Sequence, residues 1–266
     1  DNGEKVDNGY GEIDIMKGAE QAKMCTLGGS GTDTLTLDTG DDITGADVTA
    51  VENATVVGSV TMTLAQHNAL TLDAADSDDT VNVSTAGTLT GDSDIKTYNL
   101  ADGVNTFTLG ATAQDVDTGA GTNTIVTAAV DDIDGTLGGS GTDTLVMDDV
   151  DDITGANVTA VEHVTVEGSV AMTAAQHTGF TTMAAAGTSD LITLFGTGNI
   201  TADADVETYI LGNGGRTITL AANSAQTITG GGTGTDTIAV GGTTFSGTVS
   251  GVEQFTVTDG GDITGV

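Results

Sequence analysis

The chain has 266 residues, and its 39 acidic residues against five Lys and Arg give a formal net charge of −34. This balance argues against a nucleic-acid partner and an anionic membrane surface, because both are bound through Lys and Arg that pair with phosphates. Forty glycines, no proline, no tryptophan and 3% aromatic residues argue against a globule with a thick aromatic core, while a hydrophobic content of 37% argues against disorder.

Residues 1–25 differ in composition from the rest of the chain. They contain three of the five basic residues, and the run IDIMKGAEQAKM at 13–24 is the best helix candidate in the sequence. We interpret 1–25 as an N-terminal arm or cap, because a repeat domain needs its first rung covered. Cys25 is the single cysteine, so no disulfide forms within the chain. No apolar run approaches the roughly 18 residues of a spanning helix, and we expect no membrane insertion.

A long internal repeat begins near residue 26. Residues 27–71 match 137–181 at an offset of 110 without a gap, and 94–114 match 205–226 at an offset of 111 to 112. The phrase DITG occurs at 42–45, 152–155 and 262–265. The sequence therefore predicts a repetitive domain over 26–266, with units at about 27–136, 137–229 and 230–266, the last of them incomplete.

Apolar residues alternate with polar ones inside each unit, as in Leu35/Leu37 and Val81/Val83. Alternation is typical of strands with one buried face, and Gly, Asp, Asn, Ser and Thr clusters separate them. Two strand-and-turn pieces make a rung of about 18 to 22 residues, which gives five or six rungs per 110 residues. We predict an all-β, elongated parallel β-solenoid; a repeat of β-sandwiches is the alternative, because it shows similar strand spacing.

Two short segments, LAQHNAL at 64–70 and AAQHTGF at 174–180, interrupt the strand pattern at equivalent places. The pattern predicts either a helical turn or a bulged corner in each. The histidines they carry, His67 and His177, occupy equivalent positions in the two copies of the repeat, and His163 has no counterpart. A zinc site needs three or four converging ligands, so we expect structural roles for these histidines.

The stretch GGSGTDTL at 28–35 returns unchanged at 138–145 and as GGTGTDTI at 231–238. Glycines allow a sharp reversal, the aspartate offers a carboxylate, and an apolar residue begins a strand, which predicts one corner of a solenoid. Hard cations bind carboxylate and carbonyl oxygens, so the candidate Ca²⁺ ligands are Asp33, Asp143 and Asp236. Nearby carboxylates that complete the candidate set are Asp38, Asp42, Asp148 and Asp152. The alternative is an Asx-turn without metal.

Catalytic motifs are lacking. The stretch GGSG is not a nucleophile elbow, and neither a Walker loop nor a dinucleotide loop is present. Adjacent carboxylates such as Asp78 and Asp79 face opposite sides of a strand, which is poor geometry for a shared acid–base task. We therefore predict that the protein is not an enzyme; a polysaccharide-acting β-helix enzyme is a distant third reading.

The glycine-rich turns fit the nonapeptide G-G-x-G-x-D-x-U-x of calcium-binding β-rolls. With the phrases DITGADVTAVE at 42–52 and DITGANVTAVE at 152–162, the chain resembles bacterial secreted repeat proteins of the RTX-like and surface-layer type. It departs from them because its nonapeptides stand alone rather than in tandem. The resemblance implies an extracellular or cell-surface protein that folds with calcium and serves as a lattice, sheath, filament or adhesin stalk.

The third unit ends at DITGV, before the VTAVE phrase that follows DITG in the first two units. This ending predicts a longer parent chain or a last rung completed by another subunit. An open solenoid end is a template for strand pairing, and head-to-tail contacts that do not close make filaments. We therefore expect an extracellular structural homopolymer, stabilised by calcium; a calcium-dependent adhesin or stalk module is the alternative. Cell-surface polysaccharide is a further candidate partner.

Overall fold

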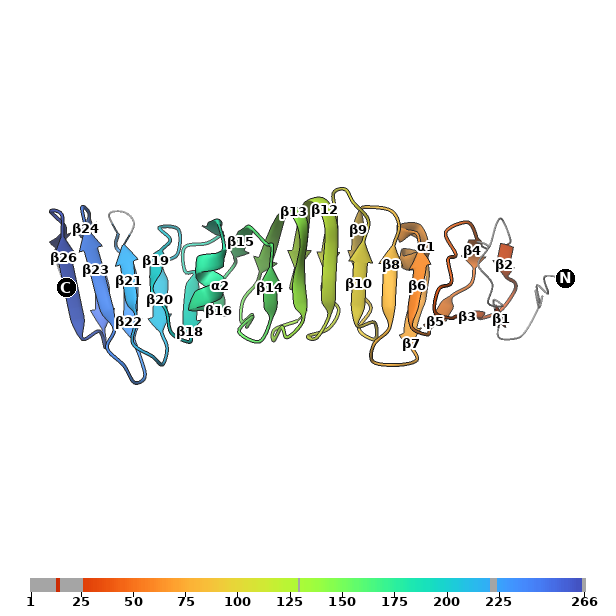
Figure 1. Ribbon diagram of the computed structural model, residues 1–266, viewed down its shortest axis with the longest axis horizontal. Helices are drawn as coiled ribbons and strands as arrows, with labels where there is room; N and C mark the ends of the chain where they lie inside the picture. The colour runs from red at the N-terminus through yellow and green to blue at the C-terminus, as the bar shows by residue number, and fades with distance from the viewer. Residues whose placement is uncertain (1–12, 15–25, 129, 221–223, 265–266) are drawn as a thin grey trace. The chain divides into compact units, whose positions relative to one another are not determined.

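The computed structural model describes residues 13–14, 26–128, 130–220 and 224–264. These residues form a parallel β-solenoid of about 12 turns (Figure 1). Every strand pair with a described register is parallel, for example the pair at Leu35 and Ala54 and the pair at Ile192 and Tyr209. The predicted all-β solenoid is confirmed, whereas a β-sandwich would have paired its strands antiparallel.

The chain divides into two compact units. Unit 1 comprises residues 1–129 and 135–143, and unit 2 comprises residues 130–134 and 144–266. The changeover at 130–144 lies where the second copy of the sequence repeat begins, at residue 137. Strand β13 (Thr136–Met147) contributes residues to both units.

Unit 1 contains three stacks of paired strands. The orders are β1-β3-β5-β7, β6-β8-β10-β12 and β9-β11-β12, and β2 pairs with β4. The strands are β1 (Ile13–Asp14), β2 (Thr26–Gly28), β3 (Thr34–Leu37), β4 (Asp47–Ala50), β5 (Asn53–Val56), β6 (Ser59–Met62), β7 (Thr71–Ala74), β8 (Thr80–Val83), β9 (Thr88–Thr90), β10 (Thr97–Leu100), β11 (Thr106–Thr108) and β12 (Asp115–Val126).

Unit 2 repeats this arrangement. Its stacks are β13-β15-β17, β16-β18-β20-β22-β25 and β19-β21-β23-β26, and β24 pairs with β27. The strands are β14 (Asn157–Thr159), β15 (His163–Val166), β16 (Ser169–Thr173), β17 (Thr182–Ala185), β18 (Leu191–Phe195), β19 (Ile200–Ala202), β20 (Thr208–Leu211), β21 (Thr217–Leu220), β22 (Thr227–Gly230), β23 (Thr237–Gly241), β24 (Thr244–Phe245), β25 (Thr248–Ser250), β26 (Gln254–Thr258) and β27 (Asp262–Ile263).

The register gives the length of one coil. Ile192 lies beside Val170 of the preceding coil. The hydrogen bonds that join neighbouring coils there connect Gly168 to Asp190, 22 residues further on, and Asp190 to Glu207, 17 residues further on. The prediction of about 18 to 22 residues per rung is therefore nearly correct. These two coils stay in register because the turns absorb the difference, while strands β16, β18 and β20 keep four or five residues each.

The core is the narrow interior of each coil. Strand β3 alternates half-buried Thr34 and Thr36 with Leu35 and Leu37, whose side chains are fully buried. Parallel stacking places the inward residue of each coil directly on that of the next, so short aliphatic side chains fill the interior without voids. The aromatic exceptions in unit 1 stack on each other, with the rings of Tyr98 and Phe107 centred 4.9 Å apart.

The two interrupting segments are short helices, α1 (Leu64–Ala69) and α2 (Ala174–Gly179). The helical-turn reading is confirmed over the bulged corner. Each begins with a capping box: the hydroxyl of Thr63 accepts the main-chain N–H of Gln66, and the Gln66 side chain accepts the main-chain N–H of Thr63. Thr173 and Gln176 repeat this box in unit 2.

Of the helix expected at 13–24, the structure describes two residues. Ile13 and Asp14 form strand β1, which pairs in parallel with Leu35 and Thr36, so the helix prediction is wrong for these two positions. Pairing with β3 satisfies main-chain groups that the sequence pattern assigned to a helix. The remaining residues of the expected arm or cap, 1–12 and 15–25, lie outside the described part of the chain.

Candidate functional site

Three glycine-rich segments, which we term the Gly–Asp corners, lie at 28–34, 138–144 and 231–237. Each leads into strand residues whose alternate side chains are buried. The first lies between β2 and β3 and the third between β22 and β23, as predicted, whereas the second is continuous strand within β13. Gly28 adopts a φ of +91°, and a Cβ atom there would lie 1.9 Å from the carbonyl oxygen of Ala50. Only glycine fits this close approach of two coils.

Each corner contains a buried aspartate next to its last residue. The exposed fraction is 4% for Asp33, 0% for Asp143 and 2% for Asp236. A buried carboxylate must be hydrogen-bonded or paired, since burial of an unsatisfied charge is costly. The hydrogen-bond partners of these three carboxylates therefore determine whether their oxygens are used by the chain or could bind an ion.

Asp33 and Asp236 accept hydrogen bonds from the main chain. The Asp33 carboxylate accepts the N–H of Gly29 at 2.7 Å. The Asp236 carboxylate accepts the N–H of Gly231 at 3.2 Å and that of Arg216 at 3.3 Å. These are Asx-type contacts that close the turn and, for Asp236, also join two coils.

Asp143 is bonded to side chains. Its carboxylate oxygens lie 2.8 Å from Nδ2 of Asn123 and 3.1 Å from Oγ1 of Thr118, both of which donate. Asn123 in turn accepts the main-chain N–H of Asn105 at 3.0 Å. The corner at 138–144 thus belongs to a column of polar side chains on successive coils. Its members Asn105, Asn123 and Asp143 each bond to the next.

Residues that stand just before strands of other stacks also bond to neighbouring coils, and they include glutamates that sequence reasoning missed. The N–H of Asp33 donates to Oε2 of Glu52 at 2.8 Å, and the N–H of Asp236 donates to Oε2 of Glu253 at 2.7 Å. Asp79 and Asp190 likewise accept main-chain N–H groups of the preceding coil. The signal was available, because each of these residues stands immediately before the first residue of a strand.

The second set of predicted ligands lies at the other end of the strands. Asp42 accepts the N–H and the hydroxyl of Thr44 at 2.9 and 2.7 Å. The main-chain N–H of Asp38 donates to Asp41 at 2.8 Å. Asp148 and Asp152 repeat these contacts with Asp151 and Thr154 in unit 2.

The two sets do not converge. Asp33 and Asp38 are five residues apart along an extended strand, which spans about 16 Å at the usual strand rise. Among the described residues, no group of three or more His, Cys, Asp or Glu side chains is arranged to hold a metal ion. An ion at a corner would therefore need main-chain carbonyls and water in addition to one carboxylate, and calcium binding stays a prediction.

The helical corners carry a second polar arrangement, which is also duplicated. Nε2 of His67 lies 3.2 Å from the hydroxyl of Tyr98, and Nε2 of His177 lies 3.3 Å from the hydroxyl of Tyr209. Both histidines are buried, with exposed fractions of 5% and 7%. Burial lowers the pKa of His67 and lowers the pKa of His177 to about 4, and it raises the pKa of both tyrosines.

His163 differs from these two. Its side chain is half-buried on strand β15, where Nδ1 lies 2.5 Å from Oγ1 of Thr182 on the neighbouring strand. All three histidines thus contact side chains of the same chain, and their structural role stays a prediction.

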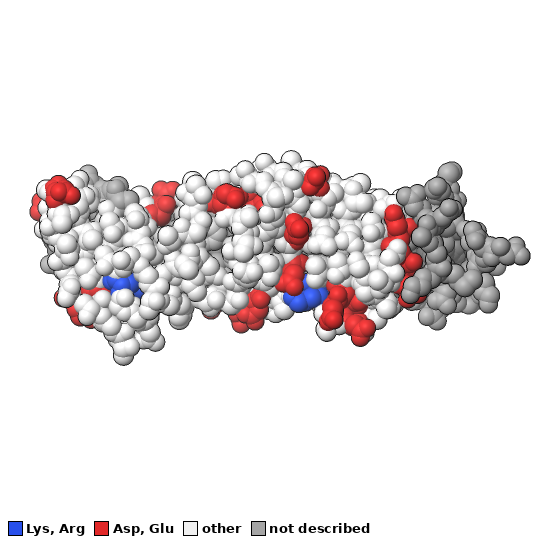
Figure 2. Space-filling view, viewed as in Figure 1, with Lys and Arg blue, Asp and Glu red and all other residues white. Residues whose placement is uncertain are grey.

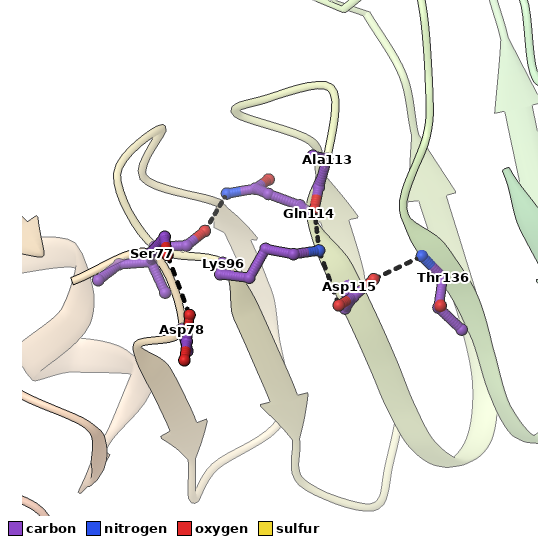
Figure 3. A network of polar contacts seen from close by, with 8 residues as sticks. Ser77, Asp78, Lys96, Ala113, Gln114, Asp115 and Thr136 are labelled. Carbon is purple, nitrogen blue, oxygen red and sulfur yellow. Dashed lines mark hydrogen bonds and ion pairs between the residues drawn. The ribbon is translucent and has the colours of Figure 1, made fainter. Parts of the chain in front are cut away.

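The two basic residues of the described chain are used structurally. Nζ of Lys96 lies 2.7 Å from Oδ2 of Asp115 and also donates to the carbonyl of Ala113 (Figure 3). Partial burial raises the pKa of Asp115, but the Lys96 ammonium and the N–H of Thr136 outweigh it and hold that pKa below its usual value. Arg216 is buried and donates to the carbonyls of Leu194, Gly196 and Asn213.

Most of the charged side chains on the surface are acidic. On the face drawn in Figure 2, red carboxylates occur at many places along the described part of the chain, and basic groups are sparse. The charges of Lys96 and Arg216 are committed to intrachain contacts, so the surface presents a field that attracts cations and repels anions.

The last coil of unit 2 presents apolar side chains to solvent. Phe255 and Val257 of β26 are 40% and 49% exposed. They stack on Ile238 and Val240 of β23, which are fully buried. Inward positions of this kind are covered elsewhere in the unit by the next coil, whereas the described residues leave those of β26 exposed, and we term Phe255 and Val257 the apolar end face.

No family model matches the chain, and no match was found for it among curated proteins or solved structures. Among the described residues, no helix is long and apolar enough to cross a membrane.

Proposed function

We propose that this protein is an extracellular structural protein that assembles with copies of itself through the ends of its solenoid, with calcium as a stabilising ion. The observation that carries the proposal is the pair of apolar side chains on β26, Phe255 and Val257, which the described residues leave exposed. A strand edge with exposed inward side chains is a template for pairing with another chain.

The partner that fits this face is a coil of the same kind. The phrase VEQFTV at 252–257 corresponds to VENATV at 51–56, and Glu253 bonds the main chain of Asp236 as Glu52 bonds that of Asp33. In unit 1 the residues equivalent to Phe255 and Val257 are covered by Leu72 and Ala74 of β7. A strand of this chain's own repeat therefore carries the apolar side chains that can cover Phe255 and Val257. A second copy of the chain would supply such a strand.

The negative surface charge favours a location where cations are abundant. Copies that carry a charge of −34 repel each other, and divalent ions or salt reduce that repulsion. Parallel solenoids with acidic Gly–Asp corners and without disulfides also resemble exported repeat proteins, as the sequence motifs indicate. Both considerations favour a location outside the cell and calcium as the counter-ion.

The test compares two exposed valines. We expect the purified chain to form ordered assemblies by negative-stain microscopy and sedimentation velocity in calcium, and Val257→Asp to remain monomeric. Val104→Asp is the matched control, because Val104 is 71% exposed and belongs to unit 1, whereas Val257 belongs to unit 2. We expect Val104→Asp to assemble like the unmodified chain.

Two outcomes would count against the proposal. A monodisperse folded monomer with and without calcium rejects self-assembly and favours the adhesin or stalk module. Assembly of Val257→Asp at the level of the control shows that another surface makes the contact.

A further inference from the structure

Each helical corner is tied to other coils by two adjacent side chains. Nε2 of Gln66 donates to the carbonyls of Ile43 and Ala46, 2.5 and 2.9 Å away in the preceding coil. The next residue, His67, reaches the hydroxyl of Tyr98 on β10, which follows it in the chain. Gln176 and His177 repeat both ties in unit 2. Of the two ties at each corner, only the histidine one can titrate near neutral pH.

The main chain also bonds to the tyrosine of each tie. The N–H of Asp92 donates to the hydroxyl oxygen of Tyr98 at 2.8 Å, and the N–H of Asp203 donates to that of Tyr209 at 2.9 Å. A tyrosine hydroxyl has one proton to give. Among the described residues, Nε2 of the histidine faces the hydroxyl, and it accepts this proton when the imidazole is neutral and protonated at Nδ1.

The surroundings of the histidines favour this neutral form. Helix α1 packs against β4, β7 and β9, whose acidic residues Asp47 and Asp73 are exposed, and helix α2 packs against β16 and β19, which carry no charged residue. The carboxylates that act on the imidazoles are Asp92 and Asp203, which raise their pKa. Burial opposes them and prevails at both corners.

We propose that the two helical corners are acid-sensitive latches: a proton on His67 or His177 removes the acceptor of the tyrosine hydroxyl and opens the corner, while the stacked strands stay paired. The histidine pKa is lower in the closed corner than the 6.5 of the free side chain. The closed state is therefore fully favoured above pH 6.5 and loses stability as the pH falls toward the closed-state value.

Hydrogen exchange of the full chain tests this inference. With a closed-state pKa of about 4 and an open-state value of 6.5, we expect the opening of the α2 corner to increase about 40-fold between pH 6.5 and pH 4.5. Exchange rates are corrected for the intrinsic pH dependence of amide chemistry. Amides of β18 and β20 serve as the internal reference and are expected to change less.

Variants distinguish the contribution of the two histidines to the acid response from that of the many carboxylates. In the double variant His67→Gln, His177→Gln the amide oxygen can accept the tyrosine hydroxyl but cannot titrate, so we expect a flat profile at both corners. His163→Gln is the matched control and should keep the profile of the unmodified chain. An unchanged acid response in the double variant, or no response in the unmodified chain, overturns the proposal.

A direct titration covers the case in which the double variant fails to fold. The imidazole resonances of His67 and His177 in the unmodified protein should titrate below pH 6.5, in the neutral form protonated at Nδ1. Titration of both at or above 6.5 overturns the proposal, whether or not the protein assembles.

Discussion

A glycine and a phenylalanine in unit 1 are replaced by an alanine and an isoleucine at the same places in unit 2. A Cβ atom on Gly91 would lie 2.7 Å from the ring of Phe107 and 2.7 Å from the side chain of Gln114. The equivalent Ala202 precedes Asp203, as Gly91 precedes Asp92, and stands beside the coil that carries Ile218. The smaller isoleucine leaves room for the methyl group.

This exchange predicts a compensated pair of substitutions. Gly91→Ala alone should destabilise unit 1 by about 1–3 kcal/mol, the usual range for overpacking a core. Combined with Phe107→Ile, the loss should be smaller than the sum of the single losses, because the two positions contact each other. Urea unfolding of the single and double variants measures the coupling, and additive losses would show that the ring is not the obstacle.

The buried aspartate at the start of β18 carries a prediction of the same kind. The Asp190 carboxylate accepts the N–H groups of Gly168 and Gly187, both at 2.8 Å. Asp190→Ala leaves two main-chain donors unsatisfied and should cost about 2–4 kcal/mol. Asp190→Asn keeps one acceptor oxygen and should cost less.

The exposed Asp205 provides the control for this prediction. Its replacement by alanine should change the free energy of unfolding by less than about 0.5 kcal/mol, because its side chain faces solvent. Because both variants lose one negative charge, the difference between their free energies of unfolding in urea reports the contribution of the hydrogen bonds of Asp190. Equal losses at Asp190 and Asp205 would contradict a stabilising role for the hydrogen bonds that Asp190 accepts.

At the scale of elements, the strands could be predicted because burial imposes a period of two on a short strand. The helical turns could be recognised because both copies interrupt that period with the same spacing. The column of polar side chains could not be predicted, because an aspartate after a glycine turn suits an ion and a main-chain N–H equally well. Only the stacking of coils decides which donors face it.

The DITG phrases show the same repeat in the stacking of the coils. Asp42 of the first phrase bridges to Thr61 of the following coil, and Asp152 of the second bridges to Ala171 in the same way. Asp152 also bridges to Asp132 of the preceding coil, as Asp262 of the third phrase pairs with Thr244 of the preceding coil. The phrases therefore take equivalent places in their coils, although successive coils of unit 2 differ in length, with 22 and 17 residues between bonded positions.

Contacts between distant residues follow from this stacking as well. His67 and Tyr98 are 31 residues apart. Their contact depends on the summed lengths of the intervening turns, which no local pattern specifies. Duplication of the pair as His177 and Tyr209 was visible in the sequence, but its meaning required the register of β10 and β20.

At the scale of the whole molecule, the dominant property is the excess of negative charge. A chain with a formal charge of −34 repels itself, so screening by salt should raise its melting temperature. Every salt screens the protein's charges to an extent that depends on its ionic strength and not on the identity of the cation. A calcium site at a Gly–Asp corner would act in addition to screening and would saturate.

The two effects can be separated by comparing CaCl₂, MgCl₂ and NaCl at equal ionic strength. Extracellular calcium modules bind with dissociation constants of about 10⁻⁴–10⁻³ M. At 10 mM calcium such a site contributes about 1.4–2.7 kcal/mol, which raises the melting temperature by about 3–10 °C for a chain of this size. We expect calcium to exceed sodium and magnesium by this margin in calorimetry, and EDTA to remove the difference. Superimposed curves would mean that the buried aspartates serve the main chain alone and that calcium acts only as a counter-ion.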